Sequence, residues 1–127
     1  MKPKPFTGFS KEAIKFIDEW RQNNDRDWFQ PKKSEYEKLV KEPALSFIYE
    51  LGSKLKLLSR GIEFDLGTNG SLLRIYRDVR FSQDKRPYNP NIRVVFCEGQ
   101  LKKAKNPGLF IKIDQKGVSD FAVMQTF

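Results

Sequence analysis

Residues 74–88 hold the side chains of this chain that are best suited to bind a ligand. Within these fifteen residues stand four arginines, one lysine and two aspartates: Arg74, Arg77, Asp78, Arg80, Asp84, Lys85 and Arg86. A buried guanidinium must be paired, because its transfer out of water costs free energy. A guanidinium that faces a cleft offers a planar fork that suits a phosphate or a carboxylate. The segment therefore predicts a binding site for an anion.

The charge balance around this cluster favours a ligand over complete internal pairing. Residues 71–105 contain nine basic and three acidic residues, so most of the net charge of +8 lies there. The alternative is a structural network in which carboxylates neutralise the arginines. The candidates for that role are Asp25, Asp27, Asp78 and Asp84. Because the acids near the cluster are too few, we expect part of it to bind a ligand.

Within the cluster, Arg74, Arg80 and Lys85 are the preferred ligand-binding residues. On a strand, Arg74, Asp78 and Arg80 would share one face and Arg77 would take the other. Asp78 is then the residue that orients the arginines. We predict that at least three of the four basic residues converge in one cleft, namely Arg74, Arg77, Arg80 and Lys85.

A second candidate segment, residues 23–29, follows the first predicted helix. We expect its Asn24 and Arg26 at the rim of the same cleft. The competing interpretation is structural, because asparagine tolerates the conformation that ends a helix and the aromatic pair that follows can fill core space. Tyr88 is expected in the core with its hydroxyl hydrogen-bonded outwards, and it is a further candidate to contact the ligand.

The amino-acid composition excludes several kinds of active site. Histidine is absent and Cys97 is the single cysteine, which excludes nucleophile–histidine catalysis, an internal disulfide and zinc-type ligand sets. The aspartates suit only a hard cation such as magnesium, and neither Asp25 with Asp27 nor Asp78 with Asp84 has a diagnostic spacing. We predict no metal and no cofactor, and we identify no catalytic residue. If the site is an enzyme's, its arginines would stabilise developing negative charge, and Asp78 or Lys85 would act as acid or base.

The spacing of apolar residues predicts the elements that carry these side chains. Helical spacing runs through residues 10–60, with Ser10 as N-terminal cap. Alternation then predicts strands at residues 62–66, 72–80, 92–97 and 109–114. Helices followed by strands indicate an α+β fold, with N-terminal helices packed on a mostly antiparallel sheet in a single domain. Cys97 is expected to be a small buried apolar residue.

Two other classes of function remain open. A pI of about 9.6 and the lysines of the following loop favour nucleic acid as a second candidate partner, although the chain has no known nucleic-acid-binding motif. These lysines are Lys102, Lys103 and Lys105. The third candidate is a non-catalytic interaction domain whose arginines are paired internally. The N-terminus has no signal-peptide pattern and no apolar run reaches the ~20 residues of a membrane span, so we expect a cytoplasmic protein without a membrane partner.

The arginine segment also carries a recognisable pattern. R-x-x-R-D-x-R-F-x-x-x-K-x-P-Y, from Arg74 to Tyr88, resembles the signature of DUF2461, a widespread bacterial family of proteins of unknown function. Four residues of the other segment match the family's usual pattern as well: Asn24, Arg26, Trp28 and Phe29. The resemblance implies no established activity.

The resemblance covers residues 6–117 and implies that the chain corresponds to the N-terminal part of a family member. Residues 118–127 do not continue the family pattern. We therefore expect one domain over residues 1–127 that is incomplete at its C-terminus. The sheet would then have an exposed edge, and any site would lack part of its wall.

Overall fold

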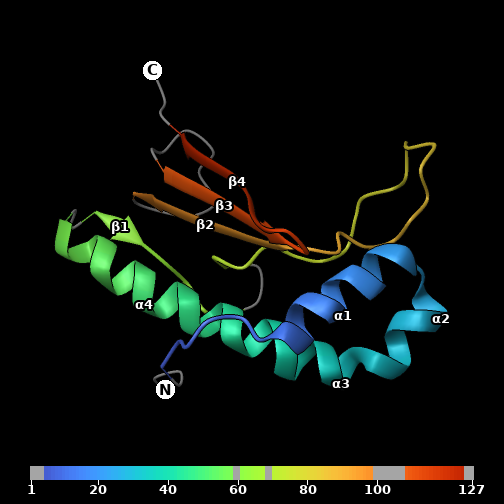
Figure 1. Cartoon of the computed structure of the whole chain (residues 1–127). Helices are drawn as coiled ribbons and strands as arrows, with labels where there is room; N and C mark the ends of the chain where they lie inside the picture. The colour runs from blue at the N-terminus through green and yellow to red at the C-terminus, as the bar shows by residue number, and fades with distance from the viewer. Residues whose placement is uncertain (1–4, 59–60, 68–69, 99–107, 125–127) are drawn as a thin grey trace.

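A helical layer precedes a sheet along the chain, as Figure 1 shows for the computed structural model. The structure describes residues 5–58, 61–67, 70–98 and 108–124. The helical elements are α1 (Lys11–Gln22), α2 (Arg26–Phe29), the 3₁₀ turn η1 (Gln30–Lys32), α3 (Lys33–Tyr36), the π-helical segment η2 (Glu37–Lys41) and α4 (Glu42–Leu58). The strands are β1 (Ile62–Glu63), β2 (Ile92–Glu98), β3 (Gly108–Asp114) and β4 (Gly117–Met124). This order confirms the predicted α+β class.

α1 begins at the predicted cap. The Ser10 hydroxyl accepts a hydrogen bond from the Ala13 amide at 3.0 Å, which satisfies a free N–H group of the first turn. The buried side chains of α1 recur at three- and four-residue spacing: Ala13, Phe16, Ile17 and Trp20. The helix ends at Asn23, which is also where the sequence predicts its end.

From Arg26 to Leu58 the chain stays helical, and only the type of helix changes along it. Pro31 lies in the first turn of η1, where its missing N–H group breaks no helical hydrogen bond. Val40, Ala44 and Ile48 are buried at four-residue spacing and continue the apolar face into α4. Within the described residues, the predicted helical region is confirmed apart from the break between α1 and α2.

The sheet has the order β1-β2-β3-β4, and every neighbouring pair is antiparallel. In the central pair, Ile92 lies opposite Ile113 and Val94 opposite Ile111, and all four side chains belong to the core. β-Branched residues of this kind suit a pleated, buried surface. Gly117, with φ of +102°, supplies the left-handed conformation at the turn into β4. The two central strands confirm the prediction to within one residue.

Residues 72–80, which the sequence predicts as a strand, do not form one. They contribute two isolated bridges, Leu72 to Val94 and Tyr76 to Tyr88. Beyond Tyr76 the backbone turns back on its own segment, and the Arg77 amide donates to the Pro87 carbonyl oxygen at 2.8 Å. Because proline has no N–H group, it cannot return a hydrogen bond and extend a ladder.

The two outer strands also differ from the prediction. β1 covers residues 62–63 where the sequence predicts 62–66, and β4 is a strand that the sequence analysis did not predict. The alternation after residue 117 is weak, but a tight turn places this segment directly beside β3. This strand therefore forms because the turn brings it beside β3, and not because its own apolar pattern is strong.

Aromatic side chains join the helical layer to the segment that precedes β2. The Phe29 ring lies 5.0 Å from Trp20 and 4.6 Å from Tyr88, centroid to centroid, and all three residues are fully buried. Cys97 is buried as well, as predicted. Among the described helices, none combines the length and the apolar character needed to cross a membrane.

Candidate functional site

Between Tyr76 and Tyr88 the chain forms a projection, which we name the arm (residues 77–87). The bridge between Tyr76 and Tyr88 closes its base. In Figure 1 the arm is the yellow loop that extends beyond the end of the sheet, on the side of α1. Most of the arginine cluster thus lies on a projection and not on a strand.

Arg77 is an internal residue of the arm. Its Nη1 donates to the carbonyl oxygens of Arg86 at 2.8 Å and Asp84 at 3.3 Å. The same atom lies 3.3 Å from the Asp84 carboxylate, and the side chain is 24% exposed. These contacts connect the two sides of the arm, so the guanidinium stabilises its shape.

Two other arginines of the arm pair with carboxylates two positions away. Arg80 Nη2 lies 3.0 Å from Asp78 Oδ2, and Arg86 Nη2 lies 2.6 Å from Asp84 Oδ2. Hydrogen bonds from Arg80 hold the pKa of Asp78 below its ordinary value, and those from Arg86 lower the pKa of Asp84. These pairs provide the local neutralisation that the structural alternative predicts.

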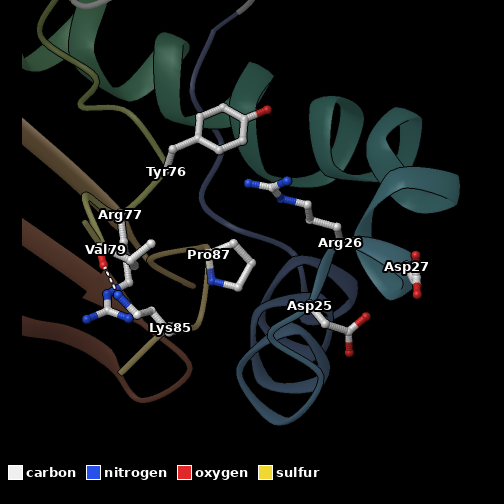
Figure 2. Close-up of a pocket in the computed structure, with 8 residues that line it drawn as sticks. All are labelled: Asp25, Arg26, Asp27, Tyr76, Arg77, Val79, Lys85 and Pro87. Atoms are coloured by element: carbon white, nitrogen blue, oxygen red, sulfur yellow. Dashed lines mark hydrogen bonds between the residues drawn. The ribbon is translucent and has the colours of Figure 1, made fainter. Parts of the chain in front are cut away.

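A cavity of about 390 Å³ lies between the arm and α2. Its lining consists of Asp25, Arg26, Asp27, Tyr76, Arg77, Val79, Lys85 and Pro87. Figure 2 shows these side chains, with Arg26 extending from α2 toward the ring of Tyr76. Three cations and two carboxylates therefore surround one space, together with an apolar patch from the arm and its base.

The three cations of the lining differ in their partners. Arg77 is paired within the arm, and Lys85 Nζ donates to the neutral Val79 carbonyl oxygen at 2.6 Å. Among the residues that the structure describes, the Arg26 guanidinium makes no hydrogen bond and no ion pair. Arg26 thus presents an uncompensated charge to the cavity.

The two carboxylates of the lining do not neutralise Arg26. Asp25 Oδ1 accepts a hydrogen bond from the Trp28 amide at 2.8 Å and caps α2. Figure 2 shows the Asp27 carboxylate pointing away from the arm. Over the described parts of the chain, no group of three or more acidic, histidine or cysteine residues is placed to hold a metal ion.

Asn24 joins the helical layer to the base of the arm. Its Nδ2 donates to the Tyr88 carbonyl oxygen at 2.8 Å, and its Oδ1 accepts from the Tyr88 amide at 3.0 Å. The side-chain amide therefore pairs with a backbone residue 64 positions away. Asn24 does not line the cavity, but it fixes the position of α2 relative to the arm.

Three of the eight residues predicted for the site line this cavity. These are Arg26, Arg77 and Lys85, whereas Asn24, Arg74, Asp78, Arg80 and Tyr88 lie outside the lining. The prediction that at least three of four basic residues converge is wrong for this cavity, because it receives two of them, Arg77 and Lys85. That prediction assumed the alternating faces of a strand, and the arm has no such faces. Tyr88, expected to contact a ligand, is fully buried.

The sequence analysis missed Tyr76, Val79 and Pro87 as part of the cavity. Tyr76 and Pro87 flank the base of the arm, and treating residues 72–80 as a strand hid their proximity. Pro87 could have been found from the sequence, because it is a fixed position of the arginine pattern, whereas Val79 is a variable position of that pattern. The three lysines that supported the nucleic-acid alternative, at positions 102, 103 and 105, lie outside the described residues.

The comparison with protein families identifies one family. A family model described as "Conserved hypothetical protein (DUF2461)" matches residues 12–123. The match extends past residue 117, where the sequence pattern was expected to end. No curated protein and no solved structure matches the chain.

Proposed function

The chain belongs to the DUF2461 family of conserved hypothetical proteins, and from the cavity we infer that it binds a small ligand with a phosphate or carboxylate group. The ligand would lie between α2 and the arm. The volume of about 390 Å³ falls within the range of small-molecule pockets. The chemistry of its walls supports an anion in particular.

The unpaired Arg26 guanidinium is the observation that carries this proposal. An arginine whose charge has no protein partner can give its planar set of N–H donors to a phosphate or carboxylate. The carboxylates beside it are engaged elsewhere or point away. The ligand's charge would therefore meet a cation without first displacing an ion pair.

Lys85 and Arg77 support the anion from the opposite wall. The ammonium of Lys85 has a carbonyl oxygen as partner, so part of its donor capacity remains for a ligand. The Arg77 guanidinium is already bonded within the arm. Its contribution to ligand binding is therefore its positive charge and not a free hydrogen-bond donor. We assign the first contact to Arg26 and the second to Lys85.

The test compares two variants, each of which replaces one arginine by a neutral glutamine. Arg26→Gln should weaken the binding of inorganic phosphate, or of succinate as a carboxylate probe, by roughly 10- to 100-fold, because hydrogen bonds to charged groups contribute about 1.5–3 kcal/mol. Arg80→Gln, outside the lining, should change the affinity by less than about twofold. Isothermal titration calorimetry at low ionic strength measures both. The proposal fails if the wild-type chain binds neither probe, or if both variants lose affinity equally.

A further inference from the structure

The tip of the arm presents Arg80 and Phe81, which the cavity does not use. Phe81 is 94% exposed and the Arg80 side chain is 76% exposed. Both residues belong to the arginine pattern, yet neither lines the cavity. An almost fully exposed phenylalanine contributes little to folding, because it buries little apolar surface.

The arm holds this tip in a defined position. Arg77 Nη1 donates to the Arg86 carbonyl oxygen on the returning side of the arm, and Lys85 Nζ donates to the Val79 carbonyl oxygen. Next to the tip, the Ser82 amide donates to the Val79 carbonyl oxygen at 3.3 Å. A partner that binds a segment already ordered in this way loses less conformational entropy on association.

The groups around Phe81 indicate the chemistry of its partner. The Arg80 guanidinium carbon lies 5.6 Å from the centre of the Phe81 ring. Asp78 occupies Nε and Nη2 of Arg80, so Nη1 remains available to a phosphate. The tip therefore combines an open aromatic face with a guanidinium donor, the pairing that proteins use on single-stranded nucleic acids.

Two other partners fit less well. An aromatic anchor for a protein pocket is normally surrounded by a rim of further contacts that exclude water, whereas six of the ten other arm residues are charged. A membrane-binding arm needs several apolar side chains next to its cations, whereas Asp78 and Asp84 flank this single ring. The arm itself carries four basic and two acidic residues, and this excess of positive charge favours a polyanion.

We propose that the tip of the arm binds single-stranded nucleic acid, with the Phe81 ring stacked on a base and Arg80 in contact with a neighbouring phosphate. This site is separate from the cavity and does not depend on the anion proposed there. Arg86, on the same arm, adds to the attraction for the phosphate backbone.

The test uses the full chain and a fluorescein-labelled oligothymidylate of about 15 nucleotides, which is long enough for one such site. Phe81→Ala should weaken binding, followed by fluorescence anisotropy, by roughly 5- to 100-fold. Phe81→Trp should keep the affinity, because indole also stacks, and Phe81→Leu should lose it. Leu57→Ala is the matched control, since Leu57 is also exposed, at 87%, but lies on α4.

The variants also separate the two sites. Arg80→Gln should weaken oligonucleotide binding and leave phosphate binding in the cavity intact, and Arg26→Gln should do the reverse. The proposal is overturned if Phe81→Ala and Leu57→Ala bind alike, or if a duplex of the same length binds as tightly as the single strand. It is also overturned if the chain binds anionic phosphatidylserine vesicles but not the oligonucleotide.

Discussion

Three arginines in and beside the arm show how neighbouring groups decide what a guanidinium can bind. Arg77 bonds backbone carbonyl oxygens, Arg80 pairs with a carboxylate on the surface, and the Arg26 guanidinium makes no hydrogen bond or ion pair among the described residues. The density of arginine in the sequence correctly indicates an unusual segment. It cannot indicate which arginine is free, because carbonyl acceptors occur at every residue and leave no mark in the sequence.

Tyr36 provides a test of the core through pH. Burial, followed by the charges of Glu37 and Tyr76, raises the pKa of Tyr36 to about 12. Because the folded-state pKa lies above the ordinary value of 10.0, the contribution of this residue to stability is fully present below pH 10 and is lost as pH rises toward 12. We expect this to remove roughly 2–3 kcal/mol from the free energy of unfolding.

Between about pH 9 and about pH 11.5, the free energy of unfolding should therefore fall less in Tyr36→Phe than in the wild type, because phenylalanine does not ionise. Urea unfolding followed by circular dichroism at the two pH values measures this difference. Tyr49→Phe on α4 controls for the removal of a hydroxyl from another tyrosine. An equal loss in wild type and Tyr36→Phe would show that ionisation of Tyr36 is not the cause.

The helices and the arm differ in how far the sequence predicts them. α1 and β2 follow from apolar spacing, and each has its predicted position to within one residue. Residues 72–80 have the alternation of a strand, but where they enter the arm many of the hydrogen bonds come from local side chains, which compete with a ladder. Whether side-chain hydrogen bonds or a ladder form depends on the geometry of the segment, and the spacing of apolar residues does not describe that geometry.

Arg77 should matter more to the arm than Arg80 does. Arg77→Gln removes contacts to two carbonyl oxygens and a carboxylate, so we expect the free energy of unfolding to fall by about 1–3 kcal/mol. Amide hydrogen exchange in residues 77–87 should accelerate more than in β2. Arg80→Gln breaks an exposed pair and should cost less than about 1 kcal/mol. Equal effects of the two variants would show that Arg77 does not stabilise the arm.

The cavity exists because two parts of the chain far apart in sequence meet there. The sequence analysis places Asn24 and Arg26 near the arginine segment, and the structure shows that Asn24 makes this connection. The rings of Phe29 and Tyr88 reinforce it in the core. What the sequence analysis did not predict is the division of roles, in which Asn24 positions the walls and Arg26 lines them. The expected gap in the wall of the site stays a prediction.

Asn24→Ala tests whether this single connection positions both walls. The variant removes two hydrogen bonds between the helical layer and Tyr88, so the free energy of unfolding should fall by about 1–3 kcal/mol. Phosphate affinity should fall as well, although Asn24 does not line the cavity, because Arg26 would move relative to Lys85. Asn23→Ala is the control, since the Asn23 side chain donates to the Glu19 carbonyl oxygen within α1 and bonds no other residue in the described part of the chain. Chemical denaturation and phosphate titration on both variants measure the two effects. If Asn24→Ala loses stability but binds phosphate like the wild type, the cavity does not depend on this link, and the role assigned to Asn24 in positioning it is wrong.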